Sequence, residues 1–245
     1  MRDTPAQKRR VIIAIPAYDC TAHLETIGAI IVAGQELQKA GIEWGLIYQG
    51  GSSIISTARN ALVHTFLSLP EATDLVFIDS DISFKAEELL KLIAWGAHQD
   101  IVAGAYRIKQ DELKYSVHPI LGGKNDDEMT FDQSRLLVEA EGVATGFLLI
   151  KRHVFETMQP DMLTYNDREL GKVSAFFHFD IDEKEGKYVG EDIYFCKKAK
   201  KAGFKIWLDP SMWLSHVGLK HFSGRLADSF HAIEKDEDEK IKEIA

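Results

Sequence analysis

Short apolar runs alternate with amphipathic stretches along the first hundred residues. Runs rich in β-branched residues predict buried strands, and apolar residues at helical spacing, between a polar cap and a glycine or proline, predict helices. Strands are expected at Val11–Ile15, Trp44–Tyr48, Leu75–Ile78 and Ile101–Ala103, and helices at 21–40, 52–69 and 85–98. Strands alternating with helices of this length predict an α/β fold, with a mostly parallel central sheet flanked by helices.

The second half of the chain has a different pattern. Short strand candidates lie at 114–118, 136–139, 147–150, 173–179 and 205–208, and one clear helix at 191–202. No internal repeat and no linker divides the chain, so we expect a single domain over residues 1–245. It would comprise a nucleotide-binding half at about 11–105, a smaller mixed half at about 106–220 and a charged tail at 221–245.

Composition narrows the function classes. The net charge of −9 argues against a broad nucleic-acid footprint, and we expect no nucleic-acid partner. No segment has the roughly 20 apolar residues of a membrane span. The apolar run Val11–Ile15 is too short for a secretory signal, and the two cysteines, Cys20 and Cys196, form neither a disulfide framework nor a metal motif. We therefore expect a soluble, cytoplasmic protein.

The most informative stretch is DLVFIDSDISF, residues 74–84, in which two carboxylates follow a buried strand. In an open α/β sheet, ligands bind beyond the carboxyl ends of the strands. In an extended chain Asp79 and Asp81 share a face, and together they suit Mg²⁺ or Mn²⁺. The alternative is that one aspartate caps the helix starting near Phe84 and the other is solvated.

Two later features carry further chemistry. In YVGED, Glu191 and Asp192 lie in the first turn of a predicted helix, whose N-terminus keeps acids ionised, as a general base requires. Acids at this position also stabilise helices without any catalytic role. His216, in WLSHVG, could complete a metal site begun by two carboxylates, and His221 is a competing candidate.

Five motifs now appear in a familiar order: IPAYD, FIDSD, GVATGFLLIKRHVFE, GED and SHVG. With these motifs, which span about Val11 to Gly218, the chain resembles the nucleotide-sugar-dependent glycosyltransferases of the GT-A fold, particularly the inverting family 2 type. The resemblance implies a UDP- or GDP-sugar donor, a glycan or other hydroxyl acceptor, and Mn²⁺ or Mg²⁺ as cofactor. The first half would bind the nucleotide-sugar, and the second would bind the acceptor and catalyse transfer.

The resemblance also implies residue roles. Its metal set is Asp79, Asp81 and His216, in which Asp81 binds the ion directly, His216 is the other protein ligand, and Asp79 faces the ribose or sugar of the donor. Asp192 would take the proton from the acceptor hydroxyl, and Glu191 would orient the acceptor or cap the helix. The implied donor-binding residues are Pro16, Ala17, Tyr18, Asp19, Arg59, Asp79, Ser80, Thr145 and Gly146.

Two of these assignments leave alternatives open. Arg59 would contact the nucleotide or form an internal ion pair with Asp79, and Thr145-Gly146 would pass close to the donor sugar or form a plain turn. Where family 2 members often carry acidic residues that read the base, this chain has YQGGSS, so its base recognition must differ.

The charged stretch 180–190 is expected to be a mobile loop that closes over the donor.

Three other functions remain possible from the sequence. DSDIS resembles the motif of haloacid-dehalogenase-type phosphatases, in which the first aspartate is a nucleophile. A sugar nucleotidyltransferase would share a related fold but carries a glycine-rich basic loop, which AYDCTAH is not. A degenerate nucleotide-sugar-binding module is the non-enzymatic alternative, and the complete set of acids and His216 argues against it.

Overall fold

The computed structural model describes residues 8–112, 114–119, 137–184 and 186–228. The helices are α1 (Leu24–Lys39), α2 (Ile55–Leu67), α3 (Ala86–Trp95), α4 (Arg152–Met158), the 3₁₀ helix η1 (Gln159–Asp161) and α5 (Glu191–Lys201). The strands are β1 (Arg10–Ala17), β2 (Glu43–Gly50), β3 (Asp74–Ile78), β4 (Ile82–Phe84), β5 (Ile101–Gly104), β6 (Val117–Pro119), β7 (Val138–Val143), β8 (Phe147–Lys151), β9 (Thr164–Asp167), β10 (Gly171–Ser174), β11 (Asp180–Asp182), β12 (Lys187–Val189), β13 (Trp207–Asp209), β14 (Leu214–Val217) and β15 (His221–Gly224).

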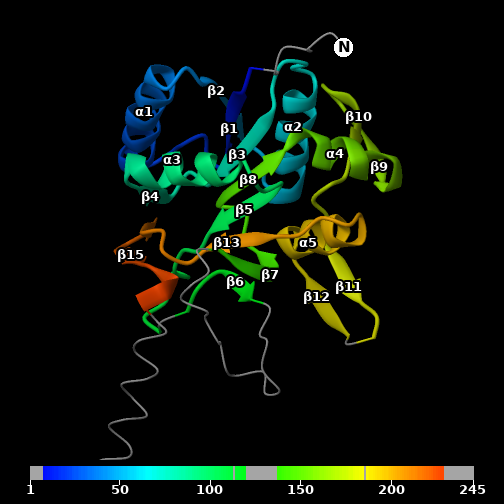
Figure 1. Cartoon of the computed structure of the whole chain (residues 1–245). Coiled ribbons are helices and arrows are strands. Elements are labelled where there is room, and N and C mark those ends of the chain that lie inside the picture. Colours follow the sequence, from blue (N-terminus) through cyan, green and yellow to red (C-terminus); the bar gives the residue numbers. More distant parts are fainter. Residues whose placement is uncertain (1–7, 113, 120–136, 185, 229–245) are drawn as a thin grey trace, which may run out of the picture.

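An eight-stranded sheet, in the order β2-β1-β3-β8-β5-β13-β7-β6, runs through the centre of the described chain (Figure 1). β1 pairs in parallel with β2 and β3, and β13 pairs in parallel with β5. β8 and β7 run against their neighbours, so the remaining six strands point in one direction. A smaller sheet, β15-β14-β4, stands beside it. This mixed α/β architecture is the fold class that the sequence predicts.

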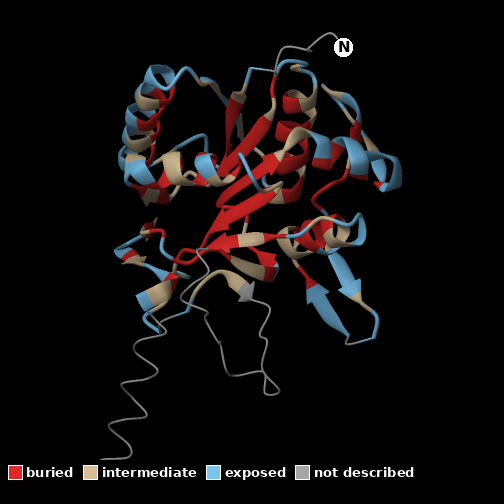
Figure 2. Cartoon of the chain, viewed as in Figure 1, coloured by how far each residue is buried: buried red, intermediate tan, exposed pale blue. Residues whose placement is uncertain are grey.

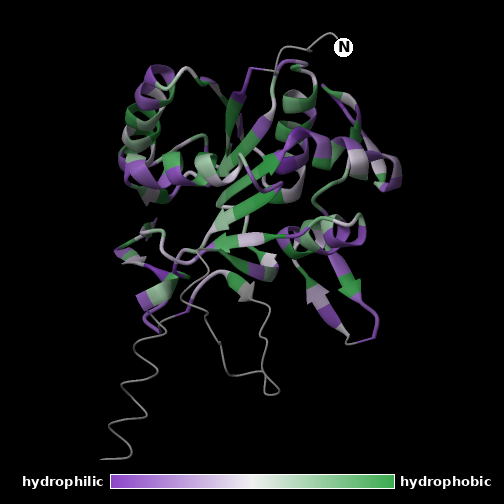
Figure 3. Ribbon diagram, viewed as in Figure 1, coloured by the Kyte–Doolittle hydropathy of each residue, from purple (hydrophilic) through white to green (hydrophobic). Residues whose placement is uncertain are grey.

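The period-2 alternation of the strands divides the core between the two faces of the sheet. Along β3, Leu75 and Phe77 belong to one buried cluster, and Val76 and Ile78 belong to the other. Residues from α2, α4 and α5 complete the first cluster, and residues from α1 and α3 complete the second. The central strands are therefore buried and apolar on both faces, and the polar residues lie on the outer surfaces of the helices (Figures 2 and 3).

The predicted elements of the first half are confirmed, with shifted boundaries. β1 continues through Pro16 to Ala17, beyond the predicted end at Ile15. Pairing with β3 stops at Ala14, so Pro16 has only β2 as a neighbour, and its missing N–H costs little there. The predicted helix caps are wrong: the N-caps of α1 and α2 are His23 and Ile54, and neither side chain caps its helix.

The second half departs further from the prediction. α4 was not expected, and only 173–174 of the predicted strand at 173–179 is a strand, within β10. The predicted loop at 180–190 contains the antiparallel hairpin β11–β12 (Figure 1). Residues 221–224 of the predicted tail form β15, and 229–245 lie outside the described residues, as does Leu136 of the predicted strand at 136–139. In the described part of the chain, no helix is long and apolar enough to cross a membrane.

The topology brings the loops that carry the candidate site residues to one edge of the central sheet. β1, β2, β3 and β5 all end there, and because β8 is antiparallel to β3, its first residue pairs with the last residue of β3, Phe147 with Ile78. The segments that follow Ala17, Gly50, Ile78 and Gly104, and the one that precedes Phe147, therefore meet at the edge where α/β sheets bind ligands.

Candidate functional site

The DSD segment is a turn that the surrounding chain holds in place. The N–H of Ile82 donates to the carbonyl of Asp79 at 3.1 Å, which closes a turn over residues 79–82. The carbonyl of Ser80 accepts from the N–H of His23, and the carbonyl of Asp81 accepts from the N–H of Val217. The expectation that Asp79 and Asp81 share one face of an extended chain is therefore wrong, because the turn gives their carboxylates different partners.

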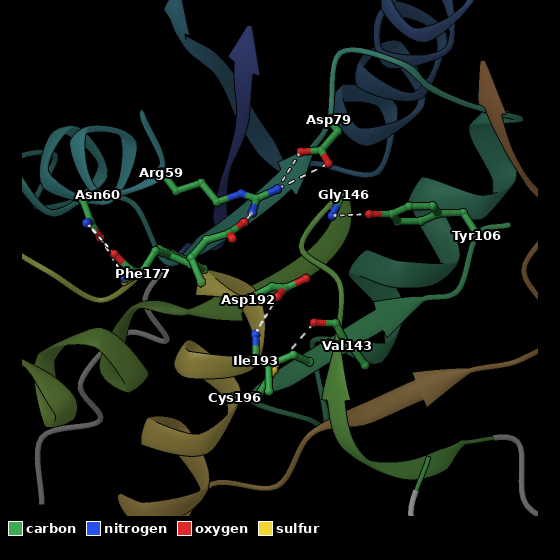
Figure 4. A network of polar contacts seen from close by, with 11 residues as sticks. Arg59, Asn60, Asp79, Tyr106, Val143, Gly146, Phe177, Asp192, Ile193 and Cys196 are labelled. Atoms are coloured by element: carbon green, nitrogen blue, oxygen red, sulfur yellow. Dashed lines mark hydrogen bonds and ion pairs between the residues drawn. The ribbon is translucent and has the colours of Figure 1, made fainter. Parts of the chain in front are cut away.

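Arg59 pairs with acids from both halves of the chain. From the second turn of α2, its Nη2 donates to both carboxylate oxygens of Asp79, at 3.1 and 3.3 Å, and its Nη1 donates to Oε1 of Glu191 at the start of α5 (Figure 4). The Arg59 side chain is buried. The pair with Asp79 is the ion-pair alternative left open by the sequence, and Glu191 is a second partner that the sequence did not predict.

A second link ties Asp79 to the turn before β8. The backbone N–H of Asp79 donates to the carbonyl of Gly146 at 3.0 Å, and the N–H of Gly146 donates to the Tyr106 hydroxyl at 3.2 Å (Figure 4). A Cβ on Gly146 would come within 2.5 Å of the Tyr106 hydroxyl and 2.7 Å of an Asp79 oxygen. Residues 145 and 146 form a turn before β8, as the alternative from the sequence has it, and an added side chain at Gly146 would collide with Tyr106 and Asp79. The predicted approach to a donor sugar stays a prediction.

The two acids of GED have different surroundings. Glu191 is buried, and burial raises its pKa, as does the charge of Asp192, whereas Arg59 opposes this rise. Asp192 is half-buried at the first turn of α5, and its Oδ1 accepts a hydrogen bond from the N–H of Ile193 at 2.7 Å. No ion pair of Asp192 occurs within the described ranges of the chain. Of the two acids, Glu191 is therefore the one paired with Arg59, and Asp192 is the more exposed.

Asp81 meets His216 on the far side of the turn. β4 and β14 pair with Ile82 opposite His216, which places Nε2 of His216 3.4 Å from Oδ2 of Asp81. Nζ of Lys109 lies 2.6 Å from the same oxygen. Burial acts to raise the pKa of Asp81, but hydrogen bonds from His216 and Lys109 outweigh it and lower this pKa to about 2. Asp81 is therefore a carboxylate at any physiological pH.

The chemistry of Asp81 and His216 fits a divalent cation. Nδ1 of His216 lies 3.0 Å from the Arg107 carbonyl, which can only accept, so Nδ1 donates to it and Nε2 is the ring nitrogen that faces Asp81. Adjacent ligands of an octahedral ion, each about 2.1 Å from it, lie about 3.0 Å apart. The observed separation of 3.4 Å is close to this value.

Asp79 is not part of this pair. Among the residues that the structure describes, no three His, Cys, Asp or Glu side chains are grouped so that they could hold a metal ion. The sequence-based set of Asp79, Asp81 and His216 is therefore brought together only in part, because Arg59 holds Asp79. An ion at Asp81 and His216 needs further oxygens from water or from another molecule.

The predicted donor-binding residues fall into two groups. Asp79, Arg59 and Gly146 form the hydrogen-bonded network described above, and Thr145 is buried next to Gly146. Pro16 and Ala17 are buried at the end of β1, whereas Tyr18 and Asp19 are exposed in the loop that follows, where Asp19 accepts hydrogen bonds from Thr21. Ser80 is half-buried in the turn.

Two residues at this edge were missed from the sequence. Tyr106 is buried, contacts Gly146 through its hydroxyl and packs edge-on against His216, with ring centroids 5.2 Å apart. Burial and then the charge of Asp79 raise its pKa. Lys109 lies on the same segment after β5 and pairs with Asp81. Neither residue belongs to a motif, so only their position after a predicted strand could have indicated them.

Buried polar atoms without a partner also concentrate here. In the described part of the chain four such side-chain atoms occur, and three of them are Nε of Arg59, Nε of Arg107 and Oγ1 of Thr145. The fourth is Nε1 of Trp44 on β2. Most buried polar groups in proteins are satisfied, and exceptions are often found where a site binds water or ligand.

Comparisons with known proteins identify a solved structure that shares this fold with a TM-score above 0.5, and looser matches below that value. No protein-family model matches the chain, and neither does any curated protein. Among solved structures, A197 from STIV superposes with a TM-score of 0.53 at 20% identity, over 89% of this chain and 91% of that one. The likeness to A197 shows a shared fold.

Two looser structural matches bear printed descriptions of nucleotide-sugar complexes. S. aureus TarS (residues 1–349), in complex with UDP-GlcNAc, matches with a TM-score of 0.46 at 12% identity, over 84% of this chain and 57% of that one. A Drosophila β1,4-galactosyltransferase 7 mutant, in complex with manganese, UDP-Gal and xylobiose, matches with a TM-score of 0.44 at 13% identity, over 91% of this chain and 73% of that one. At these scores we draw no function from either protein.

Proposed function

We propose that this protein is a metal-dependent glycosyltransferase, which moves a sugar from a nucleoside-diphosphate sugar to an acceptor hydroxyl with inversion at the anomeric carbon. One observation carries the proposal: Arg59 pairs at once with Asp79 of DSD and Glu191 of GED. These two motifs lie over a hundred residues apart in the sequence, and the pairing supports one site that holds both donor and base.

In the proposed reaction, the two motifs linked by Arg59 have separate roles. Asp79, held by Arg59, contacts the ribose or sugar of the donor. Asp192, one residue beyond Glu191 on α5, accepts the proton of the acceptor hydroxyl as its oxygen bonds to the anomeric carbon. The bond from that carbon to the diphosphate breaks, and the nucleoside diphosphate leaves with the electron pair. Attack from the face opposite the leaving group gives inversion.

Asp81 and His216 are the proposed ligands of Mn²⁺ or Mg²⁺. A divalent ion bound there would supply positive charge to the diphosphate as it leaves. Mg²⁺ and related ions are commonly held by one or two protein ligands together with substrate phosphates, which suits a site with only two protein ligands. Tyr106 packs against His216, and the Arg107 carbonyl fixes its ring, so the chain orients this ligand before any ion binds.

The test is nucleotide release from a panel of UDP- and GDP-sugars, with and without Mn²⁺, followed by transfer to simple sugar acceptors. Asp192→Asn should lower kcat by about a thousandfold, because general bases contribute 10²–10⁴-fold, and should leave the affinity for UDP or GDP unchanged. Asp161→Asn is the matched control, since Asp161 is an exposed acid on η1. Asp81→Ala should abolish the nucleotide release that requires Mn²⁺.

Three outcomes would contradict the proposal. Release of phosphate from a simple phosphomonoester, with no release from any nucleotide-sugar, would favour the phosphatase instead. A transfer rate in Asp192→Asn within tenfold of the wild type would remove the base role. NMR of the product should show inverted anomeric configuration, and retention would be incompatible with direct attack assisted by Asp192.

A further inference from the structure

The proposed metal site already contains a cation of the protein itself. Nζ of Lys109 lies 2.6 Å from Oδ2 of Asp81, the same oxygen that faces Nε2 of His216 at 3.4 Å. A divalent ion held by Asp81 and His216 would need this same oxygen. In this structure Lys109 supplies positive charge to it.

The position of Lys109 is fixed by the fold and is not that of a loose surface lysine. The segment after β5 turns back on itself, with a bridge between Arg107 and Tyr115, and the Arg107 carbonyl accepts the hydrogen bond from His216. The stem of Lys109 packs along Gly218, where an added Cβ would come within 3.2 Å of its Cδ. The segment and β14 together therefore aim the ammonium group at Asp81.

Lys109 can nevertheless leave. Its side chain is 36% exposed, so the ammonium group can be hydrated as soon as it separates from Asp81. Its four-carbon stem is flexible, and an ammonium group is a compact donor whose geometry is not tied to one carboxylate. A divalent ion at Asp81 Oδ2 would stand in the place next to this ammonium group, and the two like charges would repel each other strongly.

We propose that the Lys109 ammonium group competes with a divalent cation for Asp81. Once the ion is bound, the ammonium group moves away from Asp81 and pairs with the donor diphosphate instead. The competition needs only the residues described above. The second step rests on the proposed function, because it requires a diphosphate at this edge of the sheet. Lys109 thereby positions Asp81 and His216 in the free protein and contacts substrate in the bound one.

The first experiment measures Mn²⁺ binding without nucleotide, from the electron paramagnetic resonance signal of free Mn²⁺ during titration at constant pH. Lys109→Met should bind Mn²⁺ about tenfold more tightly than the wild type, because the ion no longer has to displace a bound cation. Lys109→Arg keeps the charge and should stay near the wild type. Lys201→Met, at an exposed lysine in the last turn of α5, is the matched control and should change nothing.

A double variant localises the effect. His216→Ala added to Lys109→Met should abolish the gain in Mn²⁺ affinity, because it removes the second ligand. Equal or weaker Mn²⁺ binding by Lys109→Met overturns the competition, and so does a gain that survives His216→Ala. Circular dichroism of each variant identifies any loss of fold.

The second experiment measures UDP and GDP binding by calorimetry at saturating Mn²⁺. Lys109→Met should bind the tighter-binding of the two nucleotides about tenfold more weakly, since a charge that contacts phosphate is lost, and Lys109→Arg should restore most of this affinity. Nucleotide affinity unchanged in Lys109→Met overturns the second step. Neither measurement depends on sugar transfer, so a protein that proved inactive on every nucleotide-sugar would contradict the proposed function and leave the competition result standing.

Discussion

Strand β3 begins with Asp74 and is followed directly by Asp79, and its two ends have opposite charge balance. At the start, the Asp74 carboxylate is fully buried between Arg9, at 2.9 and 3.0 Å, and Lys151, at 3.0 Å, and also accepts from the Thr73 hydroxyl. At the end, the partly exposed Asp79 shares its arginine with a second carboxylate, Glu191. One end has two cations for one acid, and the other has two acids for one cation.

The difference separates a structural ion cluster, at Asp74, from the end of the strand where the proposed site lies. At Asp74 burial acts to raise the pKa, but Arg9, Thr73 and Lys151 outweigh it and lower this pKa, so the cluster needs no further partner. At the other end one arginine faces two carboxylates, which leaves an excess of negative charge, and the pKa of Glu191 is raised by burial and also by Asp192, against the effect of Arg59. A divalent cation or a donor that carries one would correct that excess.

The largest expected effect is a loss of stability at the structural end. Asp74→Asn leaves Arg9 and Lys151 without their shared acid, and breaking a buried pair in this way costs about 3 kcal/mol. For a chain of this size that corresponds to a decrease in Tm of roughly 6–12 °C. Urea unfolding followed by circular dichroism gives the free energy of unfolding directly.

The same variant sharpens the comparison through a second measurement. Asp74 lies at the opposite end of β3 from Asp79, so below its Tm Asp74→Asn should bind Mn²⁺ and nucleotide as the wild type does. A free energy of unfolding within 0.5 kcal/mol of the wild type would show that the cluster contributes no net stability, as surface ion pairs often do not. Altered Mn²⁺ affinity would show that the two ends are coupled.

The next effect concerns the arginine at the other end. Arg59→Met should cost about 2 kcal/mol at pH 7.5, since two partly buried acids lose their cation. Without Arg59 the raised pKa of Glu191 rises further, and the folded state then holds a proton that the unfolded state releases. Stability of the variant should therefore fall as pH rises, so its deficit should be smaller at pH 5.5 than at pH 7.5. An equal deficit at both pH values would show that Glu191 stays ionised.

How far the sequence predicted the fold depends on the length of each element. In the first half, the four longer strands and the helices of ten or more residues leave a clear period and were all found, whereas the three-residue strand β4 was missed. In the second half, strands such as β11 and β12 have three residues and α4 has seven, which is too few for a period to be recognised. Their existence depends on tertiary pairing.

Helix boundaries failed for a related reason. The sequence rule expects Ser, Thr, Asp or Asn at the N-cap, yet His23, Ile54, Lys85, Lys151 and Gly190 occupy these positions, and none makes a side-chain cap. The backbone N–H of His23 instead donates to the Ser80 carbonyl in the DSD turn. The start of α1 is therefore fixed by a contact with a turn more than fifty residues away, and a local sequence pattern cannot predict such a contact.

The candidate site residues that lie in motifs could be predicted from the sequence. The ion pairs between distant segments could not. Asp79, Asp81, Asp192 and His216 could be selected because each stands beside a strand or helix end with a motif around it. The partnership of Arg59 with Glu191 spans 132 positions, and that of Lys109 with Asp81 spans 28, so neither leaves a trace in local sequence. Such pairs become visible only when the topology places two chain segments at one edge.

The smallest expected effect is the pH dependence of the Asp74 cluster. Its lowered pKa in the folded state means that the unfolded chain, with an aspartate pKa of about 3.9, takes up a proton first as the pH falls. The stabilisation by Asp74 is therefore complete above about pH 5, begins to fall near pH 4, and is lost as the pH passes through the folded-state pKa. The difference in free energy of unfolding between the wild type and Asp74→Asn should be constant from pH 7 to 5 and shrink at pH 4 and 3. A difference that stays constant to pH 3 would show that Asp74 takes up its proton at the same pH in the folded and unfolded states, so that its pKa is not lowered. A difference that shrinks already at pH 6 would show that the stabilisation comes from a group other than Asp74.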